Sequence, residues 1–116
     1  MIDADARTAP AGAPTSGPVT LINSFQVPVA RDEEFHALWE RTSRYFTRQP
    51  GFRSLRLHRA VDDGAVYRWV NVARWDSEAD FRAAHATEEF RRVVTAPGWE
   101  EFPSLPALFE EVTVVG

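Results

Sequence analysis

Apolar and polar residues alternate with a period of two along four stretches of this chain, and this pattern predicts β-strands over residues 19–27, 52–61, 65–75 and 108–115. The third stretch is the most regular. Tyr67, Trp69, Asn71, Ala73 and Trp75 fall on one face of it, while Arg68, Val70, Val72 and Arg74 fall on the other. The first stretch has the same character, since Asn23 sits in a row of apolar residues.

A period of three to four residues takes over between the strands and predicts helices. Residues 32–48 carry one apolar stripe, with Asp32 as the expected N-cap; the stripe is Phe35, Leu38, Trp39, Thr42, Tyr45 and Phe46. Ser77 and Asp80 have the spacing of a capping box that begins a second helix, and Thr87 is expected to cap a further short one.

The order of these elements, β-α-β-β-α-β, predicts an α+β, ferredoxin-like fold with a four-stranded antiparallel sheet. The turn signal Asp62-Asp63-Gly64 joins the second and third strands as a hairpin. Helices of such a fold cover one face of the sheet. The other face is expected to expose Ile22, Leu57, Val70 and Val72 or their neighbours, and an exposed apolar sheet face predicts a homodimer.

Composition narrows the class of protein. The chain has 116 residues, a net charge of −4 and no cysteine. An acidic chain is a poor partner for nucleic acid, and the lack of cysteine excludes disulfides and thiolate metal sites. No apolar run is long enough to span a membrane and no signal peptide is visible, so a cytoplasmic location is expected. Residues 1–18 are rich in Ala, Pro, Gly, Ser and Thr and are expected to be a disordered tail, followed by one domain over residues 19–116.

The two strand asparagines are the first candidates for chemistry. Asparagine is a poor strand former, and a buried amide left unpaired costs about 1–3 kcal/mol. Asn23 and Asn71 therefore either pair with each other or with the backbone, or face a ligand. The pattern alone leaves both readings open.

Four segments together resemble the antibiotic biosynthesis monooxygenase family. They are residues 19–25, the segment Arg48-Gln-Pro-Gly-Phe52, residues 67–75 and residues 81–90. The similarity is greatest to the cofactor-independent anthrone oxygenases of aromatic polyketide pathways. It implies a dimeric α+β barrel of ferredoxin-like subunits with a pocket between the helices and the sheet of each subunit.

The resemblance also implies roles for particular residues. Asn71 and Trp75 match the Asn-x-x-x-Trp motif of the anthrone oxygenases, and Asn23 matches a first-strand asparagine of the nogalamycin-type enzyme. His85 has no counterpart in the anthrone oxygenases, and it is a candidate base for the substrate's carbon-bound proton because of its own imidazole chemistry. The expected walls for a flat substrate are Trp39, Tyr45, Trp69 and Phe81. The actinorhodin-type enzyme has a tyrosine where this chain has Phe81.

The implied activity is oxidation of an aromatic polyketide, of anthrone or naphthacenone type, to a quinone with O2 and without a cofactor or metal. Two alternatives keep the same fold: a polyketide cyclase, which consumes no oxygen, and a non-catalytic small-molecule binding protein. Haem degradation is a minor reading, because Val93 and Val94 stand where the haem-degrading members of the family place an iron-ligating histidine.

Overall fold

The computed structural model describes residues 17–116, so most of the predicted tail lies outside the described residues. The strands are β1 (Val19–Phe25), β2 (Phe52–Arg59), β3 (Trp69–Trp75) and β4 (Ser104–Phe109). The helices are α2 (Asp32–Phe46), α3 (Glu78–Ala84) and α4 (Glu88–Val94), with 3₁₀ turns η1 (Val29–Arg31) and η2 (Trp99–Glu101). The predicted ferredoxin-like order is confirmed. No helix within the described part of the chain is long and apolar enough to cross a membrane.

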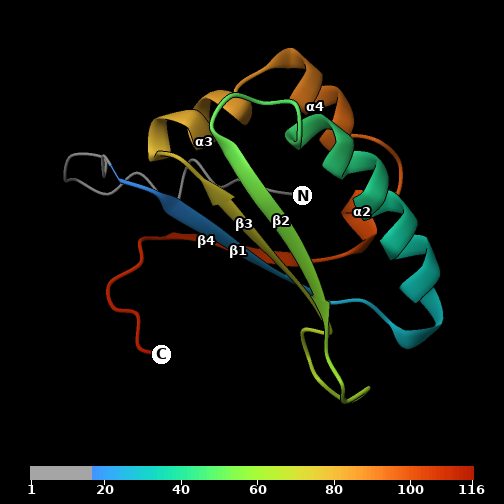
Figure 1. Cartoon of the computed structure of the whole chain (residues 1–116). Helices are drawn as coiled ribbons and strands as arrows, with labels where there is room; N and C mark the ends of the chain where they lie inside the picture. The colour runs from blue at the N-terminus through green and yellow to red at the C-terminus, as the bar shows by residue number, and fades with distance from the viewer. Residues whose placement is uncertain (1–16) are drawn as a thin grey trace.

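The four strands form one antiparallel sheet in the order β2-β3-β1-β4, and the helices lie on one side of it (Figure 1). Strands β1 and β3 occupy the centre. Their register places Asn23 directly opposite Asn71, with Leu21 opposite Ala73 and Phe25 opposite Trp69. Because side chains alternate across a strand, this register puts both asparagines on the helix side of the sheet.

Local chemistry accounts for the helix boundaries. The Ser77 hydroxyl accepts a hydrogen bond from the Asp80 N–H at 3.1 Å, and the Thr87 hydroxyl accepts one from the Phe90 N–H at 2.9 Å. Both predicted N-caps are therefore confirmed. Gly51 follows α2 with φ of 80°, a conformation that glycine adopts without a steric cost.

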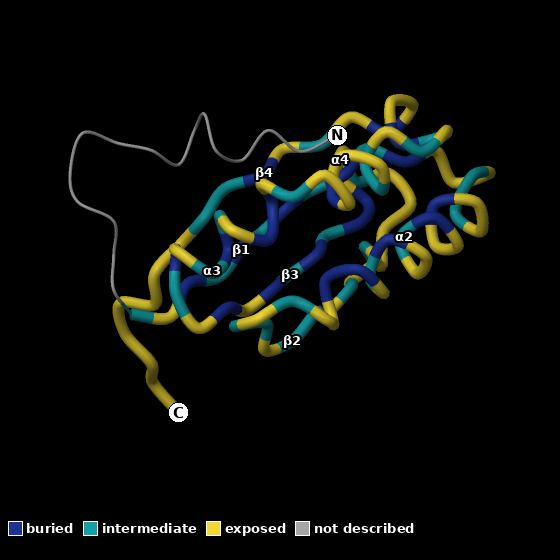
Figure 2. The backbone as a smooth tube through the Cα atoms, turned by 90° about the horizontal axis from the view of Figure 1, so that it is seen from above, coloured by how far each residue is buried: buried dark blue, intermediate teal, exposed yellow. Residues whose placement is uncertain are grey.

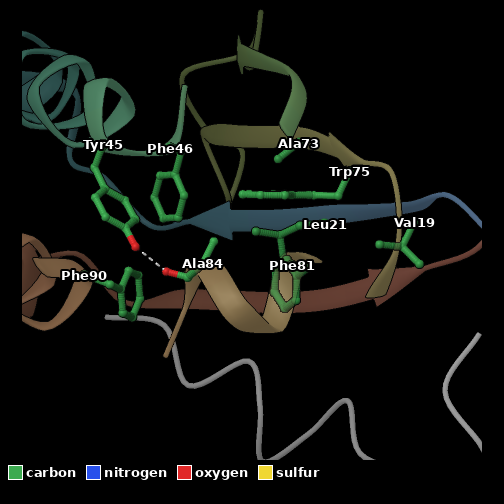
Figure 3. Close-up of a cluster of buried hydrophobic side chains, with 9 residues drawn as sticks. All are labelled: Val19, Leu21, Tyr45, Phe46, Ala73, Trp75, Phe81, Ala84 and Phe90. Atoms are coloured by element: carbon green, nitrogen blue, oxygen red, sulfur yellow. Dashed lines mark hydrogen bonds between the residues drawn. The ribbon is translucent and has the colours of Figure 1, made fainter. Parts of the chain in front are cut away.

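The core between sheet and helices divides into two aromatic clusters, and the buried stretches of the chain face one another there (Figure 2). The first is drawn in Figure 3 and consists of Val19, Leu21, Tyr45, Phe46, Ala73, Trp75, Phe81, Ala84 and Phe90. The second consists of Phe25, Val27, Phe35, Leu38, Trp69, Trp99 and Phe102. The asparagine pair belongs to neither cluster.

Two sequence predictions about the sheet are wrong. The last strand is Ser104–Phe109 rather than residues 108–115, and Val112 and Val114 are exposed. β4 contains Pro106, a residue without an N–H, which is tolerated because β4 is an edge strand that pairs with β1 alone. The register of β2 shifts between Phe52 and Ser54, and Leu57 consequently packs on the helix side rather than on the bare face.

Asp32 and Arg68 also differ from the prediction. Asp32 is the first residue of α2 rather than its N-cap, and its carboxylate accepts two hydrogen bonds from the Arg68 guanidinium, at 2.6 and 3.1 Å. The Trp69 indole N–H donates to the same carboxylate at 2.9 Å. Arg68 is therefore buried instead of lying on the outer face, and the start of α2 is tied to the start of β3.

Asp32→Asn is expected to lower the melting temperature at pH 7 by about 5 °C or more, because it leaves the buried Arg68 without its closest carboxylate. The hydrogen bonds from Arg68 hold the pKa of Asp32 below its usual range. A lowered folded-state pKa gives stability that is complete above the unfolded pKa of about 4 and is lost as the pH falls through the folded pKa. The variant should therefore also lose less stability than the wild type between pH 5 and pH 3, taken as the approximate window set by these pKa values.

Melting curves by circular dichroism at a series of pH values measure both effects. The control is Glu33→Gln, which neutralises the neighbouring, exposed carboxylate on the same helix turn. Equal losses in the two variants would show that the Asp32 ion pair has no special role.

Candidate active site

Asn23 and Asn71 are both buried, and three of their four side-chain amide atoms have no hydrogen-bond partner among residues 17–116. Asn23 is 0 % exposed and Asn71 is 8 % exposed. Among residues 17–116, neither amide atom of Asn23 has a partner, and the amide oxygen of Asn71 has none. The two amides thus do not satisfy each other although their Cα atoms are paired across β1 and β3. Buried polar groups are nearly always paired, so this departure calls for a reason.

Both amides line a small cavity between the sheet and α2. Its volume is about 30 Å³, and the lining residues are Asn23, Phe25, Trp39, Thr42, Ser43, Phe46, Leu55, Asn71 and Trp99. A cavity of this size has room for roughly one or two water molecules, far less than a fused aromatic ring system needs. The cavity lies where the two aromatic clusters meet, since Phe46 belongs to the first cluster and Phe25 and Trp99 belong to the second.

Trp75 belongs to the first cluster, His85 packs against that cluster, and neither residue lines the cavity. Trp75 is 1 % exposed, and its indole N–H has no acceptor among the described residues. The His85 ring stacks on Phe81 with 4.1 Å between ring centroids. Its Nδ1 lies 2.6 Å from the Phe81 carbonyl oxygen. Because a carbonyl can only accept, Nδ1 carries the proton in the neutral ring and Nε2 is the basic atom.

Phe46 connects the two groups of predicted site residues. Its ring lines the cavity and also packs against Trp75 and His85, at centroid distances of 6.2 and 5.1 Å. The predicted catalytic set is therefore divided in this structure. Asn23 and Asn71 line the cavity. Trp75 and His85 do not line it, but both pack against Phe46.

The four predicted substrate-binding residues are placed differently from one another. Trp39 lines the cavity, whereas Phe81 is buried in the first cluster. The Tyr45 hydroxyl donates to the Ala84 carbonyl, as Figure 3 shows, and Trp69 donates to Asp32. Tyr45 and Trp69 thus have their polar groups engaged in holding helices in place.

Six cavity residues were not predicted as site residues: Phe25, Thr42, Ser43, Phe46, Leu55 and Trp99. Thr42 was the only aliphatic hydroxyl within the apolar stripe of α2, which was the available signal. Trp99 comes from a proline-flanked segment whose packing partner could not be identified from the sequence, and Phe25 looked like an ordinary core residue. Within residues 17–116 no group of three or more His, Asp or Glu side chains is placed to hold a metal ion.

A ferredoxin-like fold with a cavity between its sheet and its helices, floored by two asparagines, defines an α+β protein with a candidate small-molecule site. The chain belongs to the antibiotic biosynthesis monooxygenase family, which it matches over residues 18–96. The resemblance inferred from the sequence motifs is confirmed.

The chain is similar to enzymes of Streptomyces. It is 41% identical to the tetracenomycin-F1 monooxygenase of Streptomyces glaucescens over 68 residues, which are 58% of each chain. It is 38% identical to the deoxynogalonate monooxygenase of Streptomyces nogalater over 78 residues, 67% of this chain and 64% of that one. The match thus spans about three-fifths of the length of these curated relatives.

The fold agrees with a solved structure from the same group. SnoaB, a cofactor-independent oxygenase from Streptomyces nogalater, superposes with a TM-score of 0.71 and 31% identity, over 85% of this chain and 97% of that one. The ferredoxin-like fold expected from the sequence is shared with that oxygenase.

Replacing either buried asparagine by leucine, which has a similar shape, is expected to raise the free energy of unfolding by about 1–3 kcal/mol. The reason is that Asn23 and Asn71 bury amide atoms that have no hydrogen-bond partner among residues 17–116. Urea unfolding of Asn23→Leu and Asn71→Leu measures the change. Gln26→Leu, which replaces a half-buried amide just beyond β1, is the control and should change stability little. A marked destabilisation by both Asn→Leu changes would show that these amides hold the structure together.

Proposed function

We propose that this protein is a cofactor-independent monooxygenase that oxidises an aromatic polyketide, of anthrone or naphthacenone type, to a quinone with O2. The observation that carries the proposal is that Asn23 and Asn71 line a cavity between aromatic clusters, with three of their four amide atoms unpaired among residues 17–116. Membership of the monooxygenase family and similarity to two polyketide monooxygenases and to a cofactor-independent oxygenase support it.

The reaction needs no electron carrier because the substrate supplies the electrons. Loss of a proton from the anthrone methylene leaves an electron-rich enolate. One electron passes to O2, and the resulting carbon radical and superoxide combine into a peroxide at that carbon. Cleavage of the O–O bond with loss of the remaining C–H proton releases water and leaves a carbonyl. One anthrone and one O2 therefore give one quinone and one water.

The residues would divide this work between them. Amide N–H groups of Asn23 and Asn71 would donate to the oxygen on which the enolate charge develops, an effect of about 3–4 kcal/mol per well-placed donor. His85, protonated at Nδ1 through its contact with Phe81, would accept the carbon-bound proton at Nε2. Trp75, whose indole N–H has no acceptor among residues 17–116, packs against His85 and would contact the substrate from that side.

Substrate binding requires the cavity to enlarge, because about 30 Å³ cannot hold a fused ring system. Phe46 is the side chain whose movement would join the cavity to the space around Trp75 and His85, since it contacts both. Trp39, which is only half-buried on α2, would form the outer wall. Movement of these two aromatic side chains would bring the divided set of predicted site residues together around one ligand.

Oxygen uptake is the direct test. Metal-stripped protein given a simple anthrone in air is expected to consume one O2 for each quinone formed, without added flavin, nicotinamide or metal. Asn71→Leu should lower kcat by about 100- to 1000-fold, as loss of an oxyanion donor does in other enzymes. Glu33→Gln, at an exposed position away from the cavity, should leave the rate unchanged.

The other outcomes separate the alternatives. Product formed without oxygen uptake would replace the oxygenase with a cyclase, and binding without any product would indicate a non-catalytic binding protein. Full oxygenase activity in Asn71→Leu would contradict the role of the amide. The expected cytoplasmic location stays a prediction.

We also propose that the bare face of the sheet joins two copies of this chain into a homodimer. Leu105 and Phe109 on β4 are 59% and 49% exposed there. Ile22, Val70, Val72 and Ala107 are half-buried apolar residues of the same face, and Thr20 and Ser24 lie beside them on β1. A contiguous apolar sheet face without a covering helix is suited to an isologous contact with its own copy about a twofold axis.

Light scattering at micromolar concentration is expected to give twice the 13.1 kDa mass of the chain. Val72→Asp places a charge in the centre of the proposed contact and should give a monomer, because an unpaired buried charge is costly. Thr47→Asp, an exposed position on the helix side, should leave the dimer intact. A wild-type monomer, or a dimer that survives Val72→Asp, would contradict this interface.

A further inference from the structure

Thr42 occupies the wall of the cavity that faces the asparagine pair. It lies in the middle of α2, is 7% exposed, and lines the same cavity as Asn23 and Asn71. The indole N–H of Trp99 donates to its hydroxyl oxygen at 3.0 Å. Trp99 is itself buried and lies beyond residues 18–96, the part of the chain that matches the family.

The direction of this hydrogen bond leaves the hydroxyl proton of Thr42 unused. An indole nitrogen can only donate, so the Thr42 oxygen is the acceptor and its own proton remains available. Hydroxyls within helices commonly donate back to a carbonyl three or four residues earlier. Thr42 makes no such bond among residues 17–116.

Three other hydroxyls in or just after helices behave differently, which makes Thr42 an exception within its own structure. The hydroxyls of Ser43, Thr47 and Thr95 donate to the carbonyls of Glu40, Arg44 and Arg91, at 2.7, 3.1 and 2.7 Å. In Thr42 the contact with Trp99 takes the place of that local bond. A buried hydroxyl that does not bond to its own helix and lines a cavity can donate into that cavity.

We propose that Thr42, oriented by Trp99, binds an oxygen of the ligand, so that the cavity recognises an aromatic compound with two oxygens on one edge. One oxygen would accept from the amides of Asn23 and Asn71 on the sheet, and the neighbouring oxygen would accept from Thr42 on α2. A ketone with a hydroxyl on the adjacent ring carbon, in the peri position, has this arrangement. The inference rests on the proposed function, whose substrate class it narrows.

Trp99 acts through Thr42 and is a positioning residue. Accepting a hydrogen bond from the indole polarises the hydroxyl and makes it a better donor. The hydrogen bond from the Trp99 indole also orients one lone pair of the Thr42 hydroxyl oxygen. This limits the directions in which the hydroxyl proton can point. Phenylalanine at position 99 would retain the aromatic packing against Phe25 and Phe35 and remove only this donor.

Binding of two stable quinones tests the proposal without any turnover. The ligands are 1,8-dihydroxyanthraquinone, which has peri oxygens, and unsubstituted anthraquinone, and their Kd values are measured by calorimetric titration. Thr42→Val is expected to weaken binding of the hydroxylated quinone about tenfold and to leave the unsubstituted one within about twofold. Thr42→Ser should restore the preference, and Trp99→Phe should reduce it by about two- to fivefold.

Thr47→Val is the matched control, since it removes a hydroxyl just after the end of the same helix that already donates to a backbone carbonyl. It should leave both Kd values unchanged. The proposal is overturned if Thr42→Val weakens both quinones equally, if Thr42→Ser fails to restore the preference, or if the wild type binds neither quinone.

The failure of the proposed function can be told apart from the failure of this inference. A Thr42-dependent preference for the hydroxylated quinone, together with no oxygen uptake from the matching hydroxylated anthrone, would retain the ligand class and remove the oxygenase. The wild type could instead consume oxygen equally fast with hydroxylated and unsubstituted anthrones. That result would support the oxygenase proposal and contradict the role of Thr42.

Discussion

The register between β1 and β3 is the constraint on which the candidate site depends. It places Asn23 opposite Asn71, and a slip of one residue would send one row of side chains, its asparagine included, to the other face of the sheet. Backbone hydrogen bonds hold this register on both sides, since β1 pairs with β4 and β3 pairs with β2. The polar floor of the cavity is thus built on the two central strands, the most constrained part of the sheet, and its position does not depend on a loop.

The helix side of the cavity is held by a separate set of contacts. At its beginning, α2 is tied to β3 by the bonds of Arg68 and Trp69 to Asp32. Towards its end, the Tyr45 hydroxyl donates to the Ala84 carbonyl of α3 and must therefore accept from Thr87, whose oxygen in turn caps α4. Three cavity residues of α2, Trp39, Thr42 and Ser43, lie between these two attachments, and Phe46 directly follows the second. Side chains there can adjust to a ligand while the helix axis stays in place.

Much of the fold and part of the site could be predicted from the sequence. Alternation along β1 and β3 was enough to place Asn23 and Asn71 on the helix side, and the caps Ser77 and Thr87 follow local rules. The contact of Trp99 with Thr42 joins positions 57 residues apart, so no local pattern contains it. Local patterns also missed the register shift in β2 and the position of β4 along the chain. A bulge and an edge strand depend on how the strands assemble into the sheet, which the local sequence does not contain.

The distribution of polar groups in the cavity bears on what decides specificity. Its aromatic walls can adapt to flat ligands of several outlines, because ring contacts are weakly directional and contribute about 0.5–1.5 kcal/mol each. The amides of Asn23 and Asn71 are more selective than the aromatic walls, because hydrogen bonds depend on where the ligand's oxygens lie. A ligand that fails to meet Asn23 and Asn71 keeps them buried without partners, whereas one whose oxygens meet them removes that cost. Discrimination among related ring systems should therefore follow the placement of oxygens along the edge that faces the sheet, more than the number of rings.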